Sequence, residues 1–112
     1  MSAVTTHVLD AATGTPANGV GVVLERAVDG GWERVGTATT DADGRCGDLG
    51  PTALPVGTYR LDFATAAWFA ASGRETFYPA VVVVFAITDP DRAHHHVPLL
   101  LSPFAYSTYR GS

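Results

Sequence analysis

The segment Thr58-Tyr59-Arg60-Leu61-Asp62-Phe63 alternates large apolar residues with polar ones. Because successive side chains of a strand point to opposite faces, this alternation is typical of a half-buried strand with one face in a core. On both sides of it, short segments rich in β-branched residues are separated by turn signals such as Asp29-Gly30-Gly31 and Asp41-Ala42-Asp43-Gly44. Helical periodicity is nearly absent, so the chain is predicted to be all-β, a sandwich or a barrel.

The same patterns predict the individual elements. Residues 66–71 break the alternation with strong helix formers and stop at Ser72-Gly73, so a single short helix is expected there. The largely apolar run at 81–88 is typical of a buried strand. The predicted strands, about seven or eight in all, include residues 5–10, 20–25, 32–39, 58–63, 81–88, 95–101 and 105–109.

Length and composition predict one folded domain, residues 1–112, because domains commonly span about 50 to 250 residues and 46% of these residues are hydrophobic. A domain of this size buries only roughly two thirds of its unfolded surface, so further burial in an oligomer would add stability. The formal net charge of −4 argues against nucleic acid as a partner, because phosphate binding needs a clustered basic surface.

The cellular location is predicted from the cysteine content and the apolar runs. Cys46 is the only cysteine, so no intrachain disulfide is possible, which fits a reducing compartment. The first residues show neither the basic region nor the long apolar region of a secretory signal. The most apolar run, residues 81–87, is far shorter than the ~20 residues of a membrane-spanning helix. We therefore expect a cytoplasmic protein with no membrane partner.

The four histidines are distributed unevenly: His7 lies alone in the first predicted strand, and His94, His95 and His96 are consecutive. Strand alternation places His94 and His96 on one face and His95 on the other. Three interpretations remain open at this point. The histidines are a hydrogen-bonded structural set, or a metal site with His7 as third ligand, or a pair for acid–base catalysis near neutral pH.

Other polar residues give weaker signals. The segment Asp41-Ala42-Asp43-Gly44 lacks the distal glutamate and further oxygen ligands of a calcium loop, so it is interpreted as a plain turn. Arg45 follows that turn and, on sequence grounds alone, is predicted to be a solvent-facing hairpin residue. Ser102 and Ser112 carry hydroxyl groups, but no nucleophile-elbow motif surrounds either, so covalent catalysis is not predicted.

Segments spread over nearly the whole chain match a known family. They are Thr6-His7-Val8-Leu9-Asp10, Gly14-Thr15-Pro16-Ala17, Asp43-Gly44-Arg45-Cys46, Glu75-Thr76-Phe77-Tyr78-Pro79, and most of the stretch from His96 to Ser112. Together they resemble the 5-hydroxyisourate hydrolases, which are transthyretin-like proteins. The final Tyr109-Arg110-Gly111-Ser112 resembles the signature that separates these enzymes from the hormone-carrying transthyretins.

The resemblance implies a transthyretin-like (prealbumin-like) β-sandwich with one short helix, forming a homotetramer whose sites lie at the dimer–dimer interface. It implies hydrolysis of the small-molecule substrate 5-hydroxyisourate to 2-oxo-4-hydroxy-4-carboxy-5-ureidoimidazoline in urate breakdown, a part of purine catabolism, without a cofactor or metal. The residues that match the family's active-site set are His7, Arg45, His96, Tyr109 and Ser112.

The reaction assigns a role to each of these residues. A histidine is the expected general base, and a nearby Arg45 would lower its pKa by like-charge repulsion and stabilise the oxyanion. We expect His7 to be the base and His96 its partner or the proton donor, although residue spacing does not decide between them. Tyr109 and Ser112 would orient substrate or water.

One position departs from the family pattern, because His95 stands where these enzymes usually have a tyrosine. Since His95 lies on the opposite face from His94 and His96, the change is expected to alter packing more than catalysis. The main alternative function is a non-catalytic transthyretin-type protein that binds a small ligand in an interface channel. Arg45 and the histidines argue against it, because such channels are mostly apolar.

Overall fold

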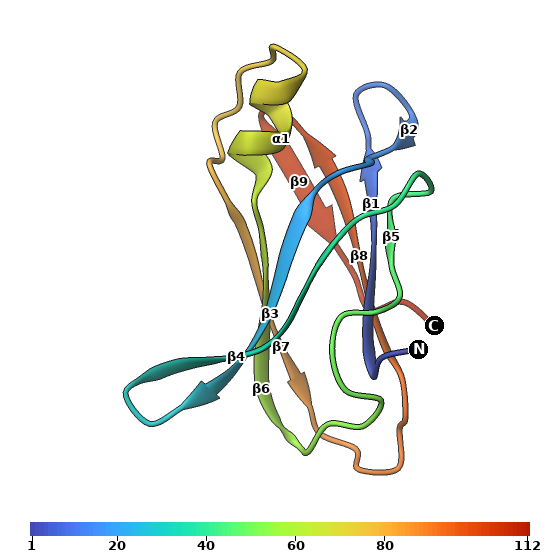
Figure 1. Ribbon diagram of the computed structural model, residues 1–112, viewed down its shortest axis with the longest axis vertical. Helices are drawn as coiled ribbons and strands as arrows, with labels where there is room; N and C mark the ends of the chain where they lie inside the picture. The colour runs from blue at the N-terminus through green and yellow to red at the C-terminus, as the bar shows by residue number, and fades with distance from the viewer.

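The computed structural model describes residues 1–112 as two β-sheets that pack face to face, with one short helix (Figure 1). The first sheet has the order β2-β1-β8-β9, with β5 pairing with β1, and the second has the order β4-β3-β6-β7. The elements are β1 (Val4–Asp10), β2 (Thr15–Pro16), β3 (Gly21–Val28), β4 (Gly31–Thr39), β5 (Arg45–Cys46), β6 (Gly57–Phe63), α1 (Thr65–Ala71), β7 (Val81–Ile87), β8 (His95–Ser102) and β9 (Ala105–Thr108).

This architecture confirms the predicted all-β sandwich with one short helix. Each predicted strand is present, with ends that differ by a few residues. The two shortest strands, β2 and β5, have only two residues each and were not expected from the sequence. They are too short for an alternation of apolar and polar residues, and only their pairing with β1 defines them.

The core lies between the two sheets and contains the alternating residues of β6. Tyr59, Leu61 and Phe63 are all fully buried, as their spacing predicts. The Tyr59 hydroxyl donates a hydrogen bond to the carbonyl oxygen of Pro55 at 2.7 Å, so its polar end is satisfied. Side chains of both sheets, such as Val8 and Leu99 from the first, join the same cluster. Each sheet therefore buries one face against the other.

Strand β1 is the element that positions the polar residues. It pairs in parallel with β8, which places Thr5 opposite His96, and antiparallel with β5, which places His7 opposite Arg45. Segments from the beginning, the middle and the end of the chain thus meet along one strand. In Figure 1 the two termini lie close to β1 and β8.

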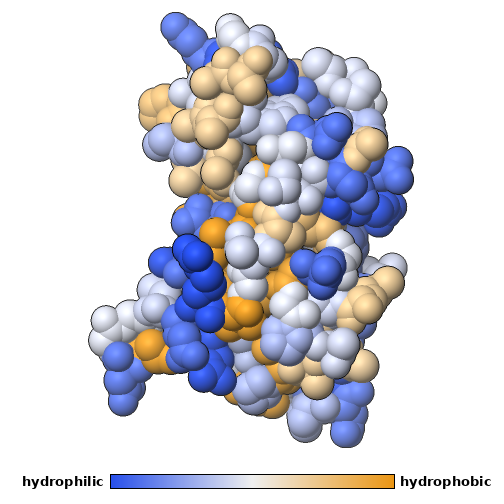
Figure 2. All heavy atoms as spheres, in the orientation of Figure 1, coloured by the Kyte–Doolittle hydropathy of each residue, from blue (hydrophilic) through white to orange (hydrophobic).

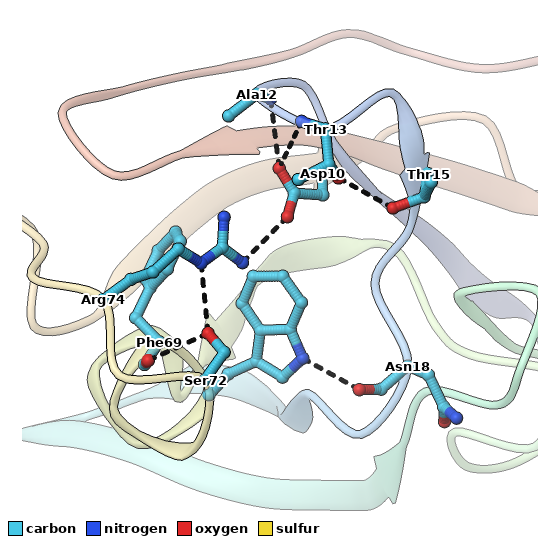
Figure 3. A network of polar contacts seen from close by, with 9 residues as sticks. Asp10, Ala12, Thr13, Thr15, Asn18, Phe69, Ser72 and Arg74 are labelled. Carbon is cyan, nitrogen blue, oxygen red and sulfur yellow. Dashed lines mark hydrogen bonds and ion pairs between the residues drawn. The ribbon is translucent and has the colours of Figure 1, made fainter.

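A second polar network fixes the connection between β1 and α1 (Figure 3). One carboxylate oxygen of Asp10 accepts hydrogen bonds from the N–H groups of Ala12 and Thr13, and the other accepts one from Arg74 at 2.8 Å. Burial alone would raise the pKa of the Asp10 carboxyl. The Arg74 hydrogen bond and charge, together with the Thr13 hydrogen bonds, outweigh burial and lower this pKa below its ordinary value.

The outer surface mixes residue types. Figure 2 shows apolar residues gathered at the waist of the face in view, with charged and polar residues around them.

The helix α1 has seven residues, and no helix of the structure has the length and apolar character needed to cross a membrane.

Candidate active site

Most of the predicted site residues meet in one small pocket. A larger hollow of about 510 Å³ lies beside α1, but none of the nine residues that line it is ionisable. The pocket beside β1 and β5 has a volume of about 200 Å³. Its lining consists of Met1, Thr5, Thr6, Arg45, Cys46, Gly47, His94, His96 and Ser112. It therefore brings two imidazoles, a guanidinium and hydroxyl groups together.

The turn before β5 presents Arg45 to this pocket. One carboxylate oxygen of Asp41 accepts hydrogen bonds from the N–H groups of Asp43, at 2.9 Å, and Arg45, at 3.0 Å. The Arg45 hydrogen bond is the main reason that the pKa of Asp41 is lowered. Gly44 has a φ of +77° and lies against the Val8 carbonyl oxygen, where a Cβ would collide with the backbone. The acidic residues of this segment thus close a turn.

His7 lies beside the pocket but is not part of its lining. Its Nε2 lies 2.8 Å from the carbonyl oxygen of Asp43. Because a carbonyl oxygen only accepts hydrogen bonds, His7 carries a proton on Nε2, and in the neutral ring Nδ1 holds the lone pair. His7 is two residues beyond Thr5 on β1, so the two side chains share one face of the sheet.

His94 and His96 both contact the same hydroxyl group. Thr5 Oγ1 lies 2.8 Å from His94 Nε2 and 2.8 Å from His96 Nδ1. The two imidazole rings are nearly parallel, at an angle of 25°, with centroids 6.3 Å apart. Both histidines therefore point to one face of the sheet, as strand alternation predicts, and His95 does not line this pocket.

The electrostatic surroundings keep His96 neutral near pH 7. Burial is the largest cause that lowers the pKa of the His96 imidazole, followed by the positive charges of Arg45, His94 and His7. A hydrogen bond with the backbone of Thr5 acts in the opposite direction and is the smallest of these effects. A neutral imidazole beside a guanidinium can accept a proton from water while the cation stabilises negative charge.

The tail segment, residues 109–112, is attached to β8 through His96. The N–H of Gly111 donates a hydrogen bond to the His96 carbonyl oxygen at 2.9 Å, and Ser112 lines the pocket. Tyr109 does not line this pocket. It is 59% exposed, and it lines a second hollow of about 350 Å³ beside β7, whose lining also includes His95 and His96.

Six residues of the pocket lining were not among the predicted site residues, and two of these six, Thr5 and His94, belong to the hydrogen-bonded group around His96. His94 could have been selected from the sequence, because it shares a strand face with His96. Thr5 could not, because its position opposite His96 depends on the parallel pairing of β1 with β8, between residues 91 apart in sequence. No group of three or more His, Cys, Asp or Glu side chains lies close enough to hold a metal ion.

One pocket of this β-sandwich contains an arginine, two histidines and a serine. The fold and the pocket together define a small β-sandwich protein with a polar site suited to acid–base chemistry. Residues 4–111 match the model of the HIUase/Transthyretin family. The chain belongs to this family.

Individual relatives separate the two branches of the family. The 5-hydroxyisourate hydrolase of Mus musculus is 49% identical over 114 residues, covering 99% of this chain and 96% of the relative. The structure of the Klebsiella pneumoniae 5-hydroxyisourate hydrolase is 43% identical, with a TM-score of 0.86 over 99% of this chain and 100% of that one. Transthyretin from Sparus aurata is 34% identical, with a TM-score of 0.91 over 99% and 97%. The backbone alone therefore does not distinguish enzyme from transthyretin, whereas sequence identity is higher with the hydrolases.

Proposed function

We propose that this chain is a 5-hydroxyisourate hydrolase that acts in urate breakdown, with residues 1–112 as a single catalytic domain. The observation that supports it most is the pocket in which Arg45, His96 and Ser112 converge. Relatives that match over nearly the whole chain carry this enzyme name. A transthyretin-type binding function is less well supported, because an apolar channel would not place a guanidinium beside two imidazoles.

The proposed reaction is the opening of a cyclic amide-type bond by water. An imidazole takes a proton from water as the water oxygen adds to C6 of the substrate, and the guanidinium of Arg45 stabilises the oxyanion that forms. The C6–N1 bond then breaks, and N1 takes a proton from an imidazolium. The product is the ring-opened 2-oxo-4-hydroxy-4-carboxy-5-ureidoimidazoline. No cofactor takes part in these steps.

His7 is assigned as the base and His96 as its partner or the proton donor. The hydrogen bond of His7 Nε2 to the Asp43 carbonyl supports this choice, because it leaves Nδ1 of the neutral ring free to accept a proton. Once His96 has received a proton, its lowered pKa favours the transfer of that proton to the departing nitrogen. Ser112, in the pocket, is assigned to orient substrate or water, and Tyr109 to bind substrate.

We propose further that the enzyme is a homotetramer whose sites lie at the interface between dimers. The pocket of one chain, at about 200 Å³, is smaller than the roughly 300–1,000 Å³ of most small-molecule sites. A second chain would deepen it. Strands β7 and β9 end their sheets without a further partner, and exposed Val82, Val84 and Tyr106 lie on them. Such unpaired edges favour pairing with another chain.

The cytoplasm is the proposed location. Cys46 is a free buried thiol in a chain with no second cysteine, and such a thiol persists in a reducing compartment.

The decisive experiment follows the decay of 5-hydroxyisourate generated in the cuvette by urate oxidase. The wild-type protein should accelerate the decay, whereas His7→Asn, Arg45→Ala and a deletion of residues 109–112 should each abolish the acceleration and keep the fold by circular dichroism. Arg26→Ala, a change on the exposed part of β3, serves as the control and should retain activity. Turnover by the truncated protein at the wild-type rate would refute the assignment. A folded wild-type protein without turnover would favour the binding function.

A further inference from the structure

Thr5 is a pocket residue to which the proposed mechanism gives no role. It is 6% exposed and lies between His94 and His96, with its hydroxyl oxygen 2.8 Å from a ring nitrogen of each. A hydroxyl group has one proton to donate and lone pairs to accept others. The hydroxyl oxygen could accept from both rings, but its own proton has no acceptor other than these two ring nitrogens. When that proton is also hydrogen-bonded, one imidazole donates to Thr5 Oγ1 and the other accepts from it. The two histidines therefore hold complementary protons at these nitrogens.

We propose that Thr5 is a positioning residue that joins His94 and His96 into one proton-sharing pair, and that this pair acts as a unit in the hydrolysis. The kinetic part of this inference rests on the proposed function. Its structural part, the coupling of the two rings, does not depend on the reaction.

The pair accommodates one extra proton in two arrangements that differ only in hydrogen positions. In the first, His96 is the imidazolium: its Nδ1–H donates to Thr5 Oγ1, and the Thr5 hydroxyl donates to His94 Nε2. In the second, the His96 Nδ1 proton has moved to Thr5 Oγ1 and the former Thr5 proton to His94 Nε2. His94 is then the imidazolium, and neutral His96 keeps its proton on Nε2. Three heavy atoms exchange two protons, and the total charge is unchanged.

This exchange suits the assigned role of His96. After His96 receives at Nε2 the proton that the base took from water, its positive charge can pass to His94 through Thr5, and it can return before His96 donates a proton to the departing nitrogen. Burial and the Arg45 charge oppose an imidazolium at His96. A second ring that shares the proton reduces that cost.

The neighbouring residue, Thr6, has a hydroxyl group with a structural role only. Thr6 donates a hydrogen bond to the Val97 carbonyl oxygen at 2.6 Å, which ties β1 to β8. The hydrogen bonds of Thr5, in contrast, go to two titratable rings and to no carbonyl group. The groups that face this pair from the surrounding elements are His7 on β1, Arg45 and Cys46 on β5, the side chain of Arg92 at the His94 carbonyl, and the residues Met1 and Ser112.

Nuclear magnetic resonance tests the coupling without any substrate. In wild-type protein with labelled histidine, the first proton added to the pair should shift the ¹⁵N resonances of His94 and His96 at the same pH midpoint, because coupled sites titrate as a pair. In Thr5→Val, which has the same shape and no hydroxyl, the two rings should titrate at separate midpoints. Thr5→Ser retains the hydroxyl and should restore the shared midpoint.

Kinetics test whether the pair acts as a unit. Thr5→Val should lower kcat by roughly 10- to 100-fold, the lower part of the range for acid–base contributions, with KM changed by less than about threefold. In this variant, the pH profile of kcat should no longer depend on the protonation of His94. His94→Gln, whose side chain can still bond Thr5 but cannot titrate, should have a similar effect. The double variant should be no slower than the slower single variant, because the two changes break one unit. Thr65→Val, which removes a buried hydroxyl on α1 bonded to the Tyr78 carbonyl, controls for lost stability.

The outcomes are distinguishable. Separate midpoints for His94 and His96 in the wild-type protein overturn the coupling, whatever the enzyme does. An active wild-type enzyme whose Thr5→Val variant keeps the wild-type kcat and pH profile overturns the catalytic part. A wild-type protein without hydrolase activity refutes the proposed function and with it the catalytic part, while the shared midpoint still supports or refutes the coupling of the two rings.

Discussion

Gly111 lies against the His96 ring so closely that a Cβ at position 111 would stand 2.6 Å from His96 Cδ2. The same glycine donates its N–H to the His96 carbonyl oxygen at 2.9 Å. A side chain at this position would push away either the tail segment or the imidazole. This contact explains why the residue between Arg110 and Ser112 is glycine, and it links the position of Ser112 to the orientation of His96.

Gly111→Ala is therefore expected to reduce activity far more than stability. The added methyl group should displace the ring or the tail, and a misplacement of about 1 Å can cost up to about 100-fold in rate. The melting temperature should change little, because the tail segment follows the last strand and no residue of it belongs to the hydrophobic core. Gly57→Ala is the matched control, since its Cβ would meet only one atom, at an ordinary distance of 3.7 Å. Wild-type kcat in Gly111→Ala would contradict the argument.

The pKa of His96 should rise toward its ordinary value of 6.5 when Arg45 is replaced by methionine. Burial is the largest cause of the lowered pKa and would remain, but the repulsion from the guanidinium would be lost. A histidine-labelled protein titrated by nuclear magnetic resonance gives the midpoint directly. Arg26→Met, a change to an arginine paired with Glu33 on the hairpin, should leave it unchanged. The same midpoint in Arg45→Met and wild type would disprove the effect.

The stability of the folded protein should fall as the pH drops below about 6.5, the ordinary pKa of histidine. Both His95 and His96 have lowered pKa values when folded, mainly because they are buried. The unfolded chain therefore binds protons at a higher pH than the folded chain does, so the free energy of unfolding increases with pH across this window. Urea denaturation at several pH values measures the trend, and His95→Gln combined with His96→Gln should flatten it. If these substitutions leave the dependence of the free energy of unfolding on pH unchanged, groups other than His95 and His96 cause it.

The ion pair of Asp10 with Arg74 should contribute to stability. Asp10 has a side chain only 4% exposed, and Arg74→Met would leave its carboxylate without this partner. We expect a loss of about 2 kcal/mol in the free energy of unfolding, the size of a charged hydrogen bond that is partly buried. Because the folded pKa of Asp10 is lowered, this contribution is present above pH 3.8 and is lost as the pH falls through the folded value. Arg26→Met, which breaks the 3.6 Å surface pair with Glu33, should cost less than about 1 kcal/mol.

The proposed tetramer predicts that a charge on the β7 edge breaks the assembly. Val84 lies on the apolar strand β7 and is 58% exposed in the single chain. Val84→Glu would place a carboxylate there, and burying that charge between chains is costly. Sedimentation analysis should show smaller species than for the wild type. Val56→Glu changes a valine of similar exposure, 54%, outside the strands and should leave the assembly intact. A wild-type protein that sediments as a monomer would refute the proposal itself.

Much of this molecule could be predicted from local patterns. The period-two alternation of Tyr59, Leu61 and Phe63 identified a core strand, because burial of one face is a local consequence of pleating. The shared face of His94 and His96 followed from the same rule. The position of Thr5 did not, since it depends on which strands pair and in which register. Likewise, Tyr109 could not be placed from sequence, because its surroundings involve strand β7, distant along the chain.

The parallel pairing of β1 with β8 also determines when the pocket can form. The hydroxyl of Thr5 meets an imidazole 91 positions later in the chain, so a ribosome must synthesise all of the intervening residues before the two can touch. Contacts of such long range slow folding, because the intervening chain must first be confined. During synthesis, β1 emerges first and waits for its partner with an unpaired edge. The nascent protein is thus most prone to aggregation in the interval before β8 is released, and its chemistry begins only with the last strands.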